Sequence, residues 1–147
     1  DVTIQAQIFE LMEKLKREHD TAIMLITHDM GVVSELADDV AVMYMGSIVE
    51  RGSVREVLKY PDHPYTAALL RPILHKGRGQ RLEPIRGSTP DPYDRPKGCQ
   101  FAPRCDFCCE KCRQEMPPEV PVCDGHAVRC WNAEQVYAGH REEVEAV

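Results

Sequence analysis

The sequence predicts an α/β fold for the first half of the chain and a small, loop-rich, cysteine-rich extension for the second half. Two observations carry this. Apolar residues in the first half follow a helical spacing and then form a continuous run typical of a buried strand. All seven cysteines lie between Cys99 and Cys130, in a part of the chain that is also rich in proline. An odd number of cysteines without an export signal favours a thiolate metal site over a disulfide framework.

The first elements are expected in the order helix, strand, helix. Ile4, Ile8, Leu11 and Leu15 form one apolar stripe of a helix over residues 4–18. Residues 21–27 are an uninterrupted apolar run, which suits a strand covered on both faces in a parallel sheet. Residues 30–37 then predict a short helix.

A second group of elements follows directly. Residues 39–45 predict a strand, Gly46 and Ser47 a tight turn, and residues 48–52 the returning strand. Ser53 with Glu56 three residues later is typical of a capping box, so residues 53–58 are expected to form a helix. Residues 63–70 predict a further helix with Pro64 in its first turn. Alternating helices and strands indicate an α/β layered unit.

Length and charge narrow the functions open to the chain. Its 147 residues allow one ordinary or two small domains, and we place a boundary near residues 76–79, giving domains 1–76 and 77–147. The net charge of −6 argues against a nucleic-acid partner. The longest apolar stretches, about seven residues, are far short of the roughly 20 that span a bilayer. Because the first residue is Asp1 and not Met, we expect a piece of a longer protein.

His28 is the first candidate for chemistry, because it follows the expected strand where a loop turns into a helix. The segment 24–33, MLITHDMGVV, closely resembles the switch-histidine segment of ABC-transporter ATPases. Residues 39–52 resemble the hairpin that follows it in that family, and residues 1–8 are similar to the helix that leaves the D-loop. The segment HPYTAALL at residues 63–70 is similar to one in the oligopeptide and dipeptide importer ATPases.

This resemblance implies roles for two residues. His28 would reach the γ-phosphate of ATP and orient the attacking water, which suits a reaction that depends on positioning and charge stabilisation. Asp1 matches the last aspartate of the D-loop and would help couple the two ATP sites of a dimer. The sequence contains no G-x-x-x-x-G-K-[ST] phosphate loop and no signature motif, which the family places upstream. The 147 residues alone are therefore expected not to hydrolyse ATP.

The resemblance further implies ATP and Mg²⁺ as ligands of the full-length subunit. It implies a second ATPase subunit, transmembrane permease subunits and, indirectly, a peptide-binding protein as partners. The expected location is peripheral, on the cytoplasmic face of the cell membrane. A rival from another class is a non-enzymatic iron–sulfur or zinc module that senses redox state or docks a partner.

The spacing of the cysteines is compatible with several kinds of metal site. Cys105-x-x-Cys108 and Cys109-x-x-Cys112 each have zinc-knuckle spacing, and His126-x-x-x-Cys130 could complete a site. Free or oxidised thiols are a further possibility. Residues 98–105 with 126–130 match the C-terminal extension of the importer ATPases, and that resemblance selects four ligands for a [4Fe–4S] cluster: Cys99, Cys105, Cys112 and Cys130. Cys108, Cys109 and Cys123 are then supernumerary.

Overall fold

The computed structural model describes residues 2–74 and 84–136. Contacts divide the chain into two compact units, residues 1–38 and 39–147, which are described separately below. The boundary expected near residues 76–79 lies outside the described residues. No helix in the described part of the chain is long and apolar enough to cross a membrane.

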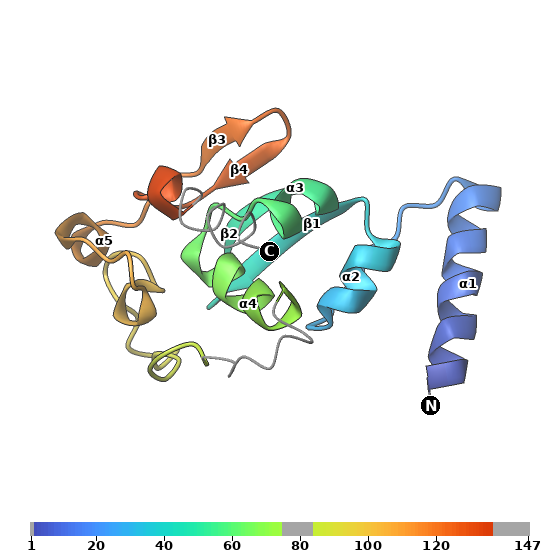
Figure 1. Cartoon of the computed structure of the whole chain (residues 1–147), viewed down its shortest axis with the longest axis horizontal. Helices are drawn as coiled ribbons and strands as arrows, with labels where there is room; N and C mark the ends of the chain where they lie inside the picture. The colour runs from blue at the N-terminus through green and yellow to red at the C-terminus, as the bar shows by residue number, and fades with distance from the viewer. Residues whose placement is uncertain (1, 75–83, 137–147) are drawn as a thin grey trace. The chain divides into compact units, whose positions relative to one another are not determined.

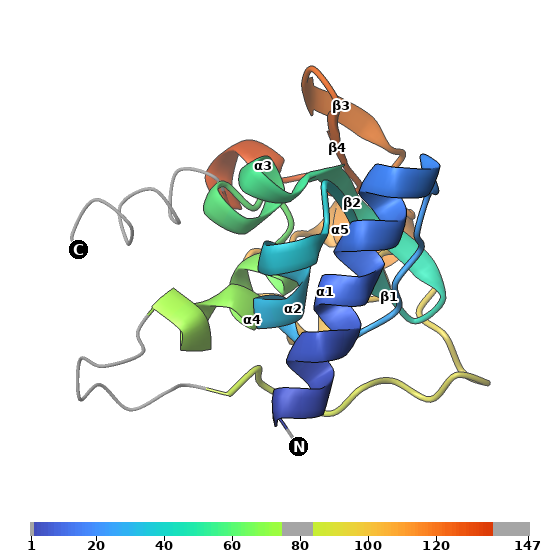
Figure 2. The same ribbon diagram turned by 90° about the vertical axis from the view of Figure 1, so that its right-hand side faces the viewer.

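The first unit contains two helices joined by an extended segment. The helix α1, Val2–His19, is continuous over its length (Figure 2), and α2 spans Met30–Leu36, so both expected helices are confirmed. The strand expected at residues 21–27 is wrong, because none of the described residues pairs with this backbone. A strand needs a neighbouring strand for its N–H and C=O groups. Without one, the side chains of Met24 and Ile26 are 88% and 91% exposed.

The second unit contains a four-stranded antiparallel sheet (Figure 1). Its strands lie in the order β1 (Asp39–Tyr44), β2 (Ser47–Ser53), β4 (His126–Val128) and β3 (Val120–Cys123). The expected mixture of helices and strands is therefore present, and every strand pairing that the structure describes is antiparallel.

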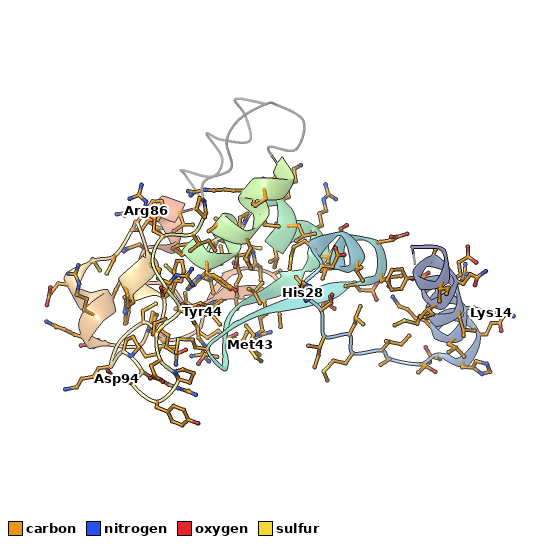
Figure 3. All side chains as sticks on the ribbon, turned by 90° about the horizontal axis from the view of Figure 1, so that it is seen from below. Lys14, His28, Met43, Tyr44, Arg86 and Asp94 are labelled. Carbon is orange, nitrogen blue, oxygen red and sulfur yellow. The ribbon has the colours of Figure 1, made fainter. Side chains whose placement is uncertain are left out.

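The β1–β2 hairpin is confirmed, with its turn one residue earlier than expected. Met45 and Gly46 form the turn, with φ angles of 47° and 80°. Two consecutive positive φ angles match the right-handed twist of paired strands, and Gly46 adopts its angle without steric cost. The side chains alternate: Tyr44 is buried and Met43 is exposed, and Figure 3 labels both.

The described part of the second unit also contains three α-helices and one 3-10 helix. The helix α3, Val54–Lys59, begins as expected, because the Ser53 hydroxyl accepts a hydrogen bond from the Glu56 N–H at 3.2 Å. The helix α4, Pro64–Leu74, begins at the expected proline and extends further than expected. In the extension, η1 (Ala102–Arg104) and α5 (Glu110–Gln114) flank Cys105, Cys108 and Cys109.

One apolar core joins the hairpin to the cysteine-rich extension. Phe101 from the extension packs edge-on against the Tyr44 ring of β1 at a centroid distance of 5.4 Å. Tyr65 of α4 contacts both rings. Val42, Val49 and Val57 surround this aromatic group. The extension, which has few large apolar residues of its own, thus obtains its core from residues 39–74.

Candidate functional site

His28 lies at the start of α2 in a locally fixed turn (Figure 3). The Thr27 hydroxyl accepts a hydrogen bond from the Asp29 N–H at 3.0 Å. The Asp29 carboxylate caps α2 by accepting from the N–H groups of Gly31 and Val32 at 2.8 and 3.4 Å. The two residues beside His28 therefore hold the backbone, while the His28 side chain is exposed.

The other ATP-related candidate, Asp1, lies outside the described residues. A groove between α1 and α2 lies in the same unit as His28, but its lining does not include that residue. Glu10, Glu13 and Glu35 line it, and Arg17 is the one basic side chain there. This surface is unlike a phosphate site, which would present cations or backbone N–H groups.

The four cysteines selected for a cluster meet around one small cavity in the second unit. The cavity lining comprises His63, Pro64, Cys99, Phe101, Ala102, Cys105, Phe107, Cys112, Pro117, Cys130, Trp131 and Asn132. None of the three supernumerary cysteines is among these residues. The lining of this cavity therefore contains the four cysteines that the family resemblance selects and none of the other three.

A close backbone approach brings the first and third of these cysteines together. The Cys99 N–H donates to the Cys112 carbonyl at 2.8 Å. Gly98 makes this possible, because a Cβ at that position would collide with the backbone of Cys112 and Arg113. At the other end of the cavity, the Asn132 N–H donates to the Cys130 sulfur at 3.4 Å. A residue with a side chain could not come this close to the backbone of Cys112 and Arg113. Gly98 is therefore required for the hydrogen bond between Cys99 and Cys112.

The protein environment suppresses ionisation of the cavity thiols. Burial raises the pKa of Cys105 and of Cys130 to about 12 and that of Cys112 to about 11, and it also raises the pKa of Cys99. A buried thiolate is costly unless a cation stabilises it. These residues therefore suit a bound metal centre, whose positive charge would reverse the effect.

The sulfur spacing bears on which metal centre fits. No three of the described cysteines have sulfurs within 4.8 Å of one another. A single tetrahedral zinc ion with Zn–S bonds of about 2.3 Å would place its sulfurs about 3.8 Å apart. In a [4Fe–4S] cluster each thiolate binds a different iron at a corner of the cube, so the sulfurs stand farther apart.

The supernumerary cysteines lie beside the cavity or away from it. Cys109 precedes α5, and its sulfur is 3.3 Å from that of Cys112. The Cys108 thiol donates to the Cys109 carbonyl at 3.6 Å. Cys123 is exposed on β3. The zinc-knuckle alternative needs Cys108 or Cys109 as ligands of the cavity, and neither lines it.

A buried polar network beside the cavity escaped the sequence analysis. The Glu50 carboxylate accepts from His126 Nε2 at 2.9 Å and from the N–H groups of Asp62 and His63 at 2.6 and 3.2 Å. Nδ1 of His126 faces the Asp62 carboxylate at 3.6 Å. The hydrogen bond to Glu50 raises the pKa of His126, whose ring lies between the carboxyl groups of Glu50 and Asp62.

This network does not suit a metal ion. Glu50, Asp62 and His126 lie close enough together to hold one, as do Glu56, Cys123 and His126. Both ring nitrogens of His126 already face carboxylates, and both Glu50 oxygens accept hydrogen bonds. The groups that could ligate an ion are thus already paired with one another, and His126 links β4 to Glu50 and Asp62.

Known proteins are similar in sequence to the segments described above. Residues 49–112 match the family model described as the C-terminal region of oligopeptide/dipeptide transporters. A putative peptide import ATP-binding protein of Brucella ovis is 45% identical over 145 residues, covering 94% of this chain and 43% of that protein. An oligopeptide transport ATP-binding protein of Bacillus subtilis is 47% identical over 136 residues, covering 92% and 42%. A dipeptide transport ATP-binding protein of Haemophilus influenzae is 44% identical over 131 residues, covering 88% and 39%.

The chain thus spans about two fifths of the length of these relatives, and the alignments cover nearly all of the chain. The family-model match includes most of β2, α3, α4 and the cysteine-rich loop up to Cys112. The chain belongs to the family of oligopeptide/dipeptide transporter ATP-binding proteins and carries that family's C-terminal region.

Proposed function

We propose that this chain is the C-terminal part of the ATP-hydrolysing subunit of an ABC importer for dipeptides or oligopeptides. The observation that carries the proposal is the sequence identity of about 45%, over nearly the whole chain, to peptide-import ATP-binding proteins. This similarity favours an ATPase subunit over a free-standing redox or docking module. ATP and Mg²⁺ are the ligands of the complete subunit.

In the complete subunit, His28 contacts the γ-phosphate and holds the attacking water. The capped turn supports this role, since Thr27 and Asp29 fix the backbone and leave the imidazole exposed for a ligand. The exposed apolar segment at residues 21–27 fits the same proposal. In an ABC-type domain it would pair with parallel strands contributed by other parts of the protein. Asp1 belongs to the D-loop and helps couple the two ATP sites of the dimer.

The proposed assembly follows from the same family. A second ATPase subunit, identical or homologous, completes the pair of ATP sites. Transmembrane permease subunits receive the motion that ATP binding and hydrolysis produce, and a peptide-binding protein delivers the substrate to them. The subunit lies peripherally on the cytoplasmic face of the membrane. Nucleic acid has no part in this function.

The catalytic proposal is tested in the protein extended upstream to include a phosphate loop. His28→Ala is expected to lower ATP turnover about 10²-fold or more, as for loss of a group that acts in the transition state. His19→Ala, which also removes an exposed histidine from the first unit, is the matched control and should keep wild-type turnover. Wild-type turnover in His28→Ala would reject the role of His28, and absence of ATP turnover in the unmodified extended protein would reject the function itself.

We further propose that Cys99, Cys105, Cys112 and Cys130 hold a [4Fe–4S] cluster. The shared cavity and the burial of the thiols support this ligand set over the zinc knuckles. When bound, such a cluster cross-links residues 99–130 through four metal–thiolate bonds. The residues around it exclude water and hold the loop in position.

Serine substitutions distinguish the two ligand sets. In anaerobically purified protein, Ser at any of the four proposed ligands should reduce iron content, while Ser at Cys108, Cys109 or Cys123 should leave iron near the wild-type level. The zinc-knuckle alternative predicts the reverse for Cys108 and Cys99: Cys108→Ser would empty the metal site and Cys99→Ser would not. Metal analysis together with the visible absorbance of iron–sulfur charge transfer provides the measurement, because zinc does not absorb there.

A further inference from the structure

The sulfur atoms of Cys109 and Cys112 lie in contact, at a distance of 3.3 Å. Cys109 is outside the proposed ligand set, and ATP hydrolysis gives it no role. The two residues are three positions apart across the start of α5, a spacing that brings side chains to the same face of a helix. The contact between the two thiols therefore follows from the backbone that connects them.

Hydrogen bonds restrain the Cys112 side of this pair. The Cys99 N–H donates to the Cys112 carbonyl at 2.8 Å and fixes the main chain. The side-chain amide of Asn132 donates to the Cys112 sulfur at 3.9 Å. The same amide is anchored by the Phe107 carbonyl at 2.6 Å. These contacts restrain the sulfur that faces Cys109.

The two thiols differ in their access to solvent. Cys109 is half-buried, whereas Cys112 is buried with 6% exposure. Cys108, although adjacent in the sequence, lies outside the pair, because its thiol donates to the Cys109 carbonyl at 3.6 Å. A small reagent from solution therefore reaches Cys109 before Cys112.

The sulfur atoms need only a small movement to form a bond. A disulfide bond is about 2.05 Å long, so the two sulfurs must approach by about 1.3 Å, which rotation of the side chains can supply. Bond formation removes two electrons and two protons from the thiols, and a partner must accept them. An external disulfide is such a partner, because a thiolate attacks it to give a mixed disulfide that a second thiol resolves.

We propose that Cys109 and Cys112 are a redox-active dithiol that undergoes exchange with low-molecular-weight disulfides such as oxidised glutathione. The Cys109 thiolate attacks one sulfur of oxidised glutathione, which releases one glutathione and leaves a mixed disulfide on Cys109. The Cys112 thiolate then attacks the Cys109 sulfur, which forms the protein disulfide and releases the second glutathione. The two thiol protons end on the two glutathione molecules, so the protein is oxidised and the glutathione disulfide is reduced.

The pair also couples the redox state of the chain to its metal centre, and this part rests on the ligand set proposed above. Cys112 is one of the four proposed ligands. Only a thiolate binds a metal, and a sulfur in a disulfide is not a thiolate. The disulfide and a metal bound to Cys112 therefore exclude each other.

The test treats the reduced, metal-free 147-residue chain with oxidised glutathione and maps its tryptic peptides without reduction. Trypsin cleaves after Lys111 and Arg113, so Cys112 leaves in a dipeptide unless a disulfide links it to the peptide of residues 105–111. This linked peptide is expected in wild type and should disappear with dithiothreitol. Cys109→Ser should lower its yield at least about tenfold, because the thiol that forms the mixed disulfide is gone.

Cys108→Ser is the matched control, because it removes a thiol from the same tryptic peptide, and it should keep the link. Cys112→Ser should stop the reaction at the mixed disulfide, so that one glutathione stays on Cys109. Absence of the linked peptide in wild type would overturn the proposal. An undiminished link in Cys109→Ser, or its loss in Cys108→Ser, would also overturn it.

Iron content tests the coupling separately. Chain purified anaerobically with iron should form the link only as iron is released. A linked peptide in chain that keeps its full iron content would overturn the coupling. Chain purified anaerobically without iron would overturn the metal centre and the coupling together, and the peptide map decides the exchange reaction in either case.

Discussion

Nε2 of His126 lies 2.9 Å from Oε1 of Glu50, although 76 residues separate the two along the chain. Both side chains are almost completely buried, at 2% and 0% exposure. Glu50 belongs to β2 and His126 to β4, and these two strands pair directly at Glu50–Val128 and Arg51–Ala127. The hydrogen bond therefore joins the β1–β2 hairpin to the end of the cysteine-rich extension.

Glu50→Gln should destabilise the second unit strongly. The substitution removes the charge that balances His126, and it replaces one acceptor oxygen with an amide donor among three hydrogen-bond donors. Breaking a buried pair in this way costs about 3–5 kcal/mol of unfolding free energy. Urea denaturation of the chain measures the loss.

The matched control for this prediction is Glu119→Gln, which removes a more exposed carboxylate paired with Arg51 on the same sheet. Ion pairs near the surface contribute about 0–1 kcal/mol, so little change in the urea midpoint is expected there. Equal losses in the two variants would contradict the importance of the buried network.

Asp62 predicts a specific pH dependence of stability. Burial and the neighbouring Glu50 carboxylate raise the pKa of Asp62 from 3.8 to about 6. Because the folded state holds this proton more tightly than the unfolded state, the free energy of unfolding falls as pH rises from about 4 to about 6. Asp62→Asn cannot titrate, so it should gain stability relative to wild type over that window.

His126 adds to the same trend at higher pH. Its pKa is raised by Glu50, so its stabilisation is complete below about 6.5 and is lost as pH rises through the folded-state value. Urea midpoints at several pH values measure both contributions. Asp94→Asn, an exposed control, should follow the wild-type profile. An identical profile in Asp62→Asn would show that this carboxyl does not control the pH response.

Gly98→Ala should disrupt the cysteine cavity. The added methyl group would collide with the backbone of Cys112 and Arg113, neither of which can rotate away as a side chain would. The hydrogen bond from Cys99 to Cys112 must then open, and the iron content after reconstitution should fall severely. Lys97→Ala, at the exposed preceding residue, is the control and should load normally. Normal loading of Gly98→Ala would mean that the two segments can separate without loss of the site.

Cys109 and Cys112 should form a disulfide when the metal-free chain is oxidised. Their sulfurs are 3.3 Å apart, and hydrogen peroxide would accept two electrons and two protons from the two thiols, giving one disulfide and two water molecules. Peptide mapping under non-reducing conditions should find the pair. Cys109→Ser should abolish it and Cys108→Ser should retain it. Iron-loaded protein should resist, because Cys112 is then a ligand, and a Cys108 disulfide in wild type would contradict this geometry.

Sequence patterns predicted the elements whose signals are local. The stripe of α1, the Ser53 cap, the proline that begins α4 and the β1–β2 hairpin all depend on residues a few positions apart, and each is confirmed. The strand predicted at residues 21–27 is wrong for the opposite reason, because a strand depends on partners that are distant in the sequence. Their apolar composition specifies a buried strand, but a strand forms only where a neighbour supplies backbone partners.

The extension was harder to interpret. Asp124-Gly125 between Val120 and Val128 is a recognisable hairpin signal, and Gly125 has a φ of 75°, yet the β3–β4 hairpin was not predicted. The pairing of Glu50 with His126 has no local signal at all, since its partners lie in different halves of the sequence. The family resemblance grouped the four cysteines, whereas the spacing of the thiols alone left the zinc knuckles open.

The position of β4 between β2 and β3 also has a consequence for synthesis. On the ribosome, the β1–β2 hairpin emerges and can form long before residues 126–128 are made. Until then, one edge of β2 has no strand beside it and Glu50 has no histidine to balance its charge. The nascent hairpin thus presents an unpaired edge open to pairing with other chains, and the last part of the extension closes it.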